Sequence, residues 1–262
     1  MNRKYAWKAD QPDFRDLVFK DANLFPKIEA KSEVDLRSNC SPVFDQGNIG
    51  SCTGNAIAGA LEFLELKELA DRYDGPEVFD PSKFVNISRL FVYWNERVSE
   101  GDPKEDGGAE IRDGIKSLVS IGACVESEWA YSEHNLFKTP SAKAFHDAKA
   151  HRISAYARLV DLDDMKSCLS AGYPFVFGFT VYEGFESDQV AATGMLELPK
   201  KGEQPEGGHA VMCVGFKEIN GKLYFIVRNS WGSTWGDQGY FYMPVEYITN
   251  TNLADDMWII VK

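Results

Sequence analysis

The residue best suited to chemistry in this sequence is Cys52, which lies where a polar, glycine-containing loop (residues 46–51) meets a long segment of helical periodicity. Unpaired N–H groups and the dipole at a helix start stabilise a thiolate. Because the thiolate is the reactive form of cysteine, we expect Cys52 to be an exposed nucleophile. Cys168 and Cys213 lie in apolar runs and are expected to be buried core residues instead.

His209 is the candidate base beside such a thiol, and Asn229 is the candidate partner that orients it. His209 follows two glycines and opens an apolar run, residues 210–216, so that a strand can anchor it at the rim of a cleft. There it can activate the thiol as a base and later return the proton. The side-chain oxygen of Asn229 can accept the second imidazole N–H and fix the ring. The remaining histidines lie in a polar stretch and are expected at the surface: His134, His146 and His151.

Two kinds of element must position these residues. Helical periodicity predicts helices over residues 53–70, about 84–98 with Ser82 as the N-cap, and about 110–120 with Gly122 as the stop. Strand-length apolar runs cover residues 175–179, 210–216, 224–227, 239–243 and 257–261, separated by turns such as Asn220-Gly221. Helices followed by strands predict an α+β fold whose two halves enclose a cleft.

The sequence resembles the papain family of cysteine proteases. Gln46 precedes Cys52 by six residues, as in that family, and the Gly-Ser-Cys core of the family is kept. Ile49 replaces a cysteine of the family, so a disulfide usual there is expected to be absent. The segment at residues 229–240, Asn-Ser-Trp-Gly-x-x-Trp-Gly-x-x-Gly-Tyr, carries the strongest part of the resemblance.

The resemblance implies a papain-like, two-lobed α+β fold with a mainly helical lobe and a β-barrel-like lobe. We expect a catalytic domain over residues 33–262, with the helical lobe at about 38–140 and the β-rich lobe at about 141–262. Residues 1–32 form a short N-terminal extension without the helical signature of the family's proregions. We hypothesise that residues 1–30 lie over the cleft as a plug.

The resemblance also implies a role for each site residue. Cys52 is the nucleophile, His209 the base, Asn229 the orienting group, and the Gln46 side chain an oxyanion donor together with the backbone N–H of Cys52. Trp231 would shield the His209–Asn229 hydrogen bond from water. No cofactor and no metal are expected. Substrate contacts are expected at Gly107, Gly108, Gly208 and Trp231.

Composition excludes several classes of partner. The net charge is −12, which argues against binding to nucleic acid or to an anionic membrane surface. No apolar run is long enough to span a membrane, and the N-terminus lacks the apolar stretch of a signal peptide. We therefore expect a soluble monomer acting on peptide or protein substrate, in a compartment that the sequence leaves open. The five cysteines are odd in number, so at least one is free of internal disulfides.

Three functions remain open at this point. The first is an endopeptidase that forms a thioester acyl-enzyme. The second, with the same chemistry, is an exopeptidase, amidase or peptide ligase. A loop near residues 197–208 that closes one end of the cleft could convert an endopeptidase to an exopeptidase. The third is a catalytically silent binding protein that keeps the fold, which the presence of all three catalytic residue types argues against.

Overall fold

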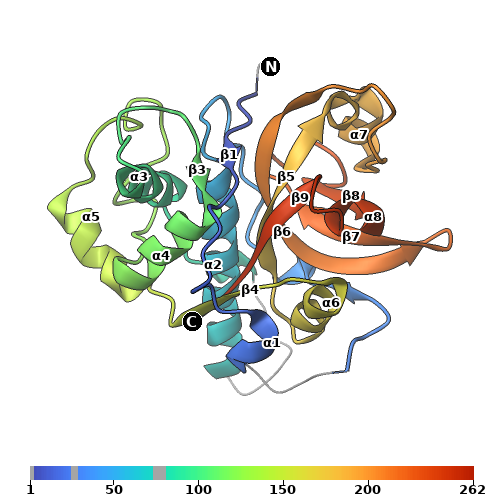
Figure 1. The fold of residues 1–262 in the computed structure, drawn as a ribbon. Coiled ribbons are helices and arrows are strands. Elements are labelled where there is room, and N and C mark those ends of the chain that lie inside the picture. The colour runs from blue at the N-terminus through green and yellow to red at the C-terminus, as the bar shows by residue number, and fades with distance from the viewer. Residues whose placement is uncertain (1–2, 25–28, 73–80) are drawn as a thin grey trace.

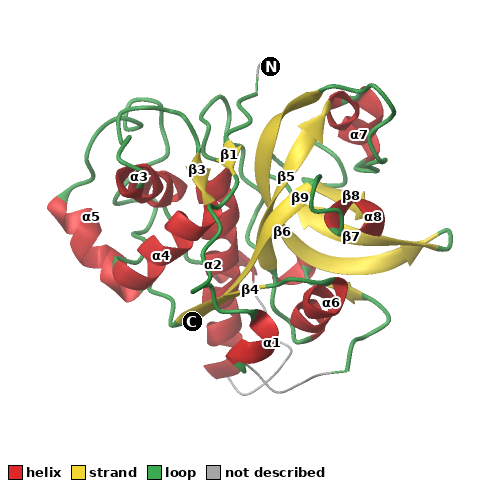
Figure 2. Ribbon diagram, in the orientation of Figure 1, coloured by secondary structure: helices red, strands yellow, loops and turns green. Residues whose placement is uncertain are grey.

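The computed structural model describes residues 3–24, 29–72 and 81–262. Helices gather on one side of the molecule and an antiparallel sheet on the other (Figures 1 and 2). The helical side consists of α2 (Cys52–Arg72), α3 (Arg89–Ser99), α4 (Ile111–Ser120) and α5 (Ala142–Asp147). The α+β, two-lobed arrangement predicted from the sequence is confirmed.

The sheet contains every predicted strand. Its order is β4-β9-β5-β6-β7-β8, with β2 pairing β6 in addition. The bounds are β2 (Val34–Asp35), β4 (Ala155–Arg158), β5 (Phe175–Tyr182), β6 (Pro205–Ile219), β7 (Lys222–Arg228), β8 (Tyr240–Pro244) and β9 (Ala254–Val261). The turn between β6 and β7 is Asn220-Gly221, both at positive φ as a two-residue hairpin turn requires.

The expected barrel-like closure is wrong, because the outer strands β4 and β8 of the described sheet do not pair with each other. Other segments cover those edges instead. Val18 bridges to Arg158 in β4, and Met195 bridges to Tyr242 in β8. Edges covered in this way need no closure to avoid exposing unpaired backbone groups.

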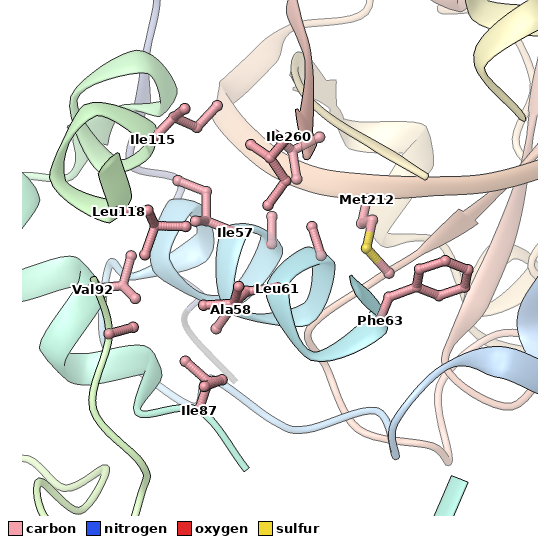
Figure 3. Packing of buried hydrophobic residues seen from close by; sticks show 14 of the residues in the cluster. Ile57, Ala58, Leu61, Phe63, Ile87, Val92, Ile115, Leu118, Met212 and Ile260 are labelled. Carbon is pink, nitrogen blue, oxygen red and sulfur yellow. The ribbon is translucent and has the colours of Figure 1, made fainter. Parts of the chain in front are cut away.

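The helix α2 is the central element, packed by helices on one side and the sheet on the other (Figure 3). Ile57 lies toward α4, while Met212 of β6 approaches α2 from the sheet side (Figure 3). Because both sides are covered, α2 is buried over nearly its whole length from Cys52 to Leu66 rather than along one stripe. The start of this helix is thereby fixed between the two lobes.

The helix α3 begins later than predicted. Its N-cap is Ser88, whose hydroxyl accepts the Phe91 N–H at 3.1 Å, and not Ser82. The preceding residue Ile87 is held in a bridge with Val125, and its N–H donates to the Glu62 carboxylate at 3.0 Å. These long-range contacts keep the chain extended where periodicity alone predicts helix.

Short elements complete the fold. The sequence analysis did not predict α5, α6 (Leu162–Ser170), α7 (Asp188–Thr193) or α8 (Val245–Ile248). Near the N-terminus, β1 (Trp7–Lys8) pairs in parallel with β3 (Ala109–Glu110), and α1 (Phe19–Ala22) follows. In Figure 1 the dark-blue N-terminal segment that carries β1 and α1 descends between the helices and the sheet.

Candidate active site

Cys52 is the first residue of α2, as the sequence predicts, but it is fully buried rather than exposed. Backbone N–H groups of Ala210 and Ala6 hydrogen-bond to its sulfur. Ala210 follows His209 in β6, so the strand that carries the predicted base lies against the predicted nucleophile. Ala6 belongs to the N-terminal segment, which therefore covers Cys52 together with β6.

His209 and Asn229 lie in hydrogen-bond contact. The Nε2 of His209 is 2.9 Å from the Asn229 Oδ1, and both side chains are buried. Because an amide oxygen only accepts, Nε2 carries the proton and Nδ1 is left as the basic nitrogen of the neutral ring. This Nδ1 has no hydrogen-bond partner among the described residues. Trp231 stacks on the imidazole, with ring centroids 5.2 Å apart.

Gln46 lies beside this group and spans the two lobes. Its Oε1 accepts the Ser230 hydroxyl at 2.5 Å, and its Nε2 donates to the Ile49 carbonyl at 3.0 Å. Tyr131 fixes the same loop, because its hydroxyl donates to the Gln46 carbonyl at 2.8 Å. The sequence analysis missed Ser230 and Tyr131. Ser230 stands inside the Asn-Ser-Trp-Gly motif, and Tyr131 ends the aromatic segment Glu128-Trp-Ala-Tyr131, for which the sequence predicts only a structural role.

Burial sets the protonation states of the thiol and the imidazole. It raises the pKa of Cys52 to about 11, against the lowering effect of the N–H groups that contact the sulfur. Burial also lowers the pKa of His209 to about 4, although the bond to Asn229 works the other way. Both groups are therefore neutral at pH 7 in this structure, and a thiolate–imidazolium pair requires that solvent return to the site.

We call residues 3–16 the strap, because they cross the site between the lobes (Figure 1). The Tyr5 ring meets the edge of the His209 ring at 6.0 Å between centroids, and the Arg3 guanidinium lies 4.1 Å from the Trp231 ring centre. The strap thus covers the predicted base as well as the predicted nucleophile.

The predicted substrate-binding glycines lie against the strap. The Ala6 carbonyl accepts the Ala109 N–H at 3.1 Å, and a Cβ at Gly108 would lie 1.6 Å from that carbonyl oxygen. On the opposite wall, a Cβ at Gly208 would lie 2.4 Å from the Trp7 carbonyl oxygen. The absence of side chains at these two positions lets an extended backbone fit between the walls. A Cβ at Gly107, in contrast, would meet no atom within 4 Å, so the close fit of the strap does not extend to that position.

The Trp7 side chain fills a hollow made by a third glycine, Gly178 of β5. A Cβ at Gly178 would lie 1.9 Å from the Trp7 indole. The indole N–H of Trp7 is buried and has no partner among the described residues. The hollow therefore accepts the apolar part of a large aromatic side chain but does not satisfy an N–H group.

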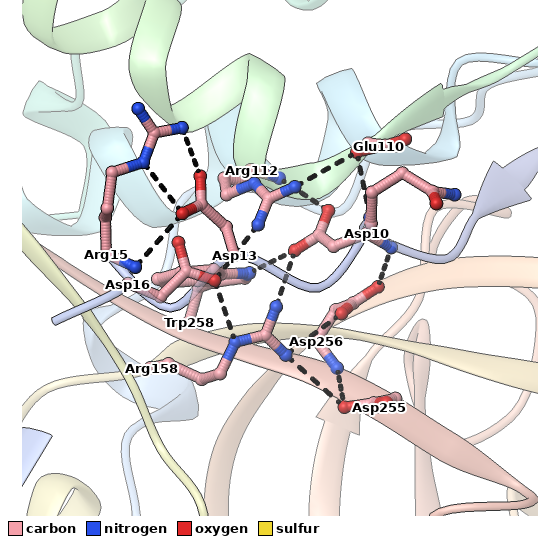
Figure 4. A network of polar contacts seen from close by, with 11 residues as sticks. Asp10, Asp13, Arg15, Asp16, Glu110, Arg112, Arg158, Asp255, Asp256 and Trp258 are labelled. Carbon is pink, nitrogen blue, oxygen red and sulfur yellow. Dashed lines mark hydrogen bonds and ion pairs between the residues drawn. The ribbon is translucent and has the colours of Figure 1, made fainter. Parts of the chain in front are cut away.

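A polar network anchors the strap to both lobes (Figure 4). Asp10 accepts the Trp258 indole N–H at 2.7 Å, the backbone N–H of Arg112 at 3.1 Å and the Arg158 guanidinium at 3.1 Å. Arg112 belongs to α4, whereas Arg158 and Trp258 belong to β4 and β9. The set that we call the latch consists of Asp10, Asp16, Arg112, Arg158 and Asp256.

Comparison with known proteins identifies the family. The model of the family described as "Papain family cysteine protease" matches residues 106–260. An uncharacterised peptidase C1-like protein of Acanthamoeba polyphaga mimivirus is 41% identical over 99% of this chain and 87% of its own length. The chain belongs to the papain family of cysteine proteases. As a cysteine peptidase it is a hydrolase that acts on peptide bonds.

Solved structures extend the likeness of this peptidase to the whole fold. Xylellain, a cysteine protease from Xylella fastidiosa, is 39% identical with a TM-score of 0.84, covering 100% of this chain and 98% of its own. Among the sequence relatives, mouse pro-cathepsin H is 44% identical over 77% of this chain, which spans about half (55%) of that relative's length. Digestive procathepsin L 3 of Tenebrio molitor, at 21% identity and a TM-score of 0.69 over 92% of this chain and 75% of its own, shows the shared fold alone.

Two further features bear on what the peptidase could bind. No group of three or more His, Cys, Asp or Glu side chains in the described parts is arranged to hold a metal ion. Within residues 3–24, 29–72 and 81–262, no helix has both the length and the apolar character needed to cross a lipid bilayer.

Proposed function

We propose that this papain-family chain is an endopeptidase that acts through a thioester acyl-enzyme, with Cys52 as nucleophile and His209 as base. The observation that carries the proposal is the buried His209–Asn229 hydrogen bond of 2.9 Å, held beside the helix start that presents Cys52. This bond fixes the tautomer in which the free Nδ1 can accept the thiol proton. Asn229 orients the ring and Trp231 keeps water from the bond.

The reaction follows from these positions. The Cys52 thiol gives its proton to His209, and the thiolate attacks the carbonyl carbon of the scissile bond. The tetrahedral intermediate collapses with cleavage of the C–N bond, while His209 returns the proton to the leaving amine. A water molecule, deprotonated by His209, then attacks the thioester and releases the acid and the thiol.

Gln46 is the proposed side-chain donor to the oxyanion. One hydrogen of its Nε2 is taken by the Ile49 carbonyl, which leaves the second for a ligand. The Ser230 hydroxyl, by donating to Oε1, fixes which end of the amide is the donor. The second donor is the backbone N–H of Cys52, which the helix itself cannot pair because it lies in the first turn.

We also propose that the strap inhibits the peptidase in cis. Ala6 presents its N–H to the Cys52 sulfur, so the strap occupies the nucleophile as a hydrogen-bond donor. Its close fit against Gly108 and Gly208 takes the path that an extended substrate needs. The full chain is then a latent form, and activity requires displacement of residues 3–16.

Peptides blocked at both termini test the endopeptidase assignment. We expect internal cleavage by the full chain, slow at first because of the strap, and none by Cys52→Ala. An epoxide thiol inhibitor should label Cys52 alone among the five cysteines. Release of single terminal residues from unblocked peptides, with blocked ones left intact, would instead establish an exopeptidase. Absence of both labelling and cleavage after removal of the strap would establish a silent scaffold.

A further inference from the structure

Asp106 is a buried carboxylate beside the active-site loop whose role the proposed chemistry leaves open. Its side chain is 6% exposed. Its Oδ1 accepts the Gly50 N–H at 3.0 Å and the Tyr93 hydroxyl at 2.9 Å. Its Oδ2 contacts the ammonium group of Lys4 in the strap.

The contacts of Oδ1 hold the carboxylate in place without the strap. Gly50 lies two residues before Cys52 in the loop that leads to the nucleophile. Tyr93 in turn accepts the Gly108 N–H at 3.0 Å, so the same network reaches the glycine segment that receives extended backbone. Asp106 is thus fixed to both parts of the wall nearest Cys52, whereas Oδ2 is the oxygen turned to the strap.

Displacement of the strap removes the cation from Oδ2. Lys4 is two residues from Ala6, whose N–H contacts the sulfur of Cys52, so the part of the strap that carries this cation is the part that crosses the nucleophile. The carboxylate then faces the substrate path with one oxygen unpaired. A carboxylate that is fixed by the protein through one oxygen and open to the cleft through the other favours a ligand of opposite sign.

We propose that Asp106 determines specificity by binding the Lys or Arg side chain of the substrate residue that supplies the scissile carbonyl. The inference rests on the proposed peptidase function. That residue is the one bonded to Cys52 in the acyl-enzyme, and the Asp106–Gly50 bond places the carboxylate beside it. In the latent form Lys4 occupies the same subsite as a substitute cation.

The experiment compares kcat/KM for pairs of doubly blocked peptides that differ at one residue. Arginine is paired with citrulline, which keeps the shape and loses the charge, and lysine with norleucine. The full chain is used, because the strap competes with both members of a pair and its occupancy cancels in the ratio. We expect a charged-to-neutral ratio of about tenfold or more at the residue that supplies the carbonyl, and little preference at its neighbours.

Two variants separate a charge effect from a structural one. Asp106→Asn keeps an acceptor for Gly50 and Tyr93 and removes the charge, so the ratio should fall to near 1. Lys4→Met empties the subsite and leaves Asp106 intact, so total activity should rise while the ratio stays. A wild-type ratio near 1, or an Asp106→Asn ratio equal to that of the wild type, overturns the inference while the peptidase function stands. Failure of every peptide, together with failure of Cys52 to label after removal of the strap, rejects the peptidase function and the inference with it.

Discussion

The imidazole of His209 shows how much of the proposed chemistry depends on single contacts. Its protonated nitrogen is committed to Asn229, and its other nitrogen has no partner among the described residues. The neutral state that burial imposes is that of a covered site, since lowering the pKa of His209 to about 4 opposes an imidazolium. Uncovering the ring is therefore part of making the nucleophile.

Asn229→Ala removes the acceptor that holds the His209 ring. We expect kcat/KM for a blocked peptide to fall by about 10²-fold or more, because a misoriented base transfers protons poorly. The melting temperature should change little, since the neighbouring strand pairing is retained. Asn252→Ala, at an exposed turn, is the control and should leave kcat/KM unchanged. Equal activity of the two variants would exclude the proposed role of Asn229.

At the scale of elements, three helices meet around one buried carboxylate. Glu96 of α3 accepts the Thr53 hydroxyl of α2 at 2.6 Å, while its other oxygen has no partner among the described residues. The lack of a side chain at Gly114 of α4 makes space for that oxygen, because a Cβ at this position would lie 2.3 Å from it. Burial raises the pKa of Glu96 to about 8, so the folded protein holds this carboxyl neutral.

Glu96→Gln should change the pH dependence of stability. Between the ordinary glutamate pKa of 4.5 and about 8, the folded wild type binds a proton that the unfolded chain has lost. The free energy of unfolding must then decrease as pH rises through this window. The variant, which cannot ionise, should lack that part of the decrease, on the order of 3 kcal/mol. Denaturant unfolding at pH 5 and pH 8 measures it, and parallel curves for the two proteins would refute the assignment.

The strap is an element whose hold on the cleft depends strongly on Trp7. Trp7→Ala empties the hollow over Gly178, so the strap should bind more weakly. We expect initial peptide hydrolysis and the alkylation rate of Cys52 both to rise by about tenfold or more. Phe14→Ala is the matched control, because Phe14 is a fully exposed aromatic residue of the same strap. A similar rise in both variants would point to general loosening rather than to the Trp7 contact.

At the scale of the whole molecule, the latch joins the strap to helices and sheet together. Asp16 pairs with Arg112 of α4 at 3.0 Å and with Arg158 of β4 at 3.5 Å, so one side chain bridges the lobes. The strap therefore does more than fill the cleft, since it ties the cleft walls to each other. Its release removes contacts from both sides at once.

Asp10→Asn should weaken the latch without altering the cleft walls. Asp10 accepts N–H groups from Trp258, Arg112 and Arg158, and an amide cannot satisfy all of them as a carboxylate does. We expect faster alkylation of Cys52 and easier cleavage of the strap by an added protease. Asp13→Asn is the control, because the Asp13 side chain bonds to neighbouring Arg15 and, among the described residues, to neither lobe. Unchanged alkylation in Asp10→Asn would show that the latch does not limit opening.

The sequence by itself determined the parts of this protein that are encoded in neighbouring residues. The helical periodicity after Cys52, the strand that begins near His209 and the Asn220-Gly221 turn all depend on local backbone preference and side-chain alternation. The order of residues in Asn229-Ser230-Trp231 likewise places a hydrogen-bond acceptor and its aromatic cover on one short segment. The fold class and the family follow from these local signals.

Only the tertiary structure decided the features that depend on which surfaces meet. Ser88 rather than Ser82 caps α3 because a distant carboxylate holds the residue before it, and the sheet stays open because unrelated segments cover its edges. The burial of Cys52 and the Lys4–Asp106 contact join residues far apart in the chain. No local sequence pattern specifies such contacts, since the residues around each partner do not indicate which distant segment will pack against it. Their energies arise only when folding removes both from water.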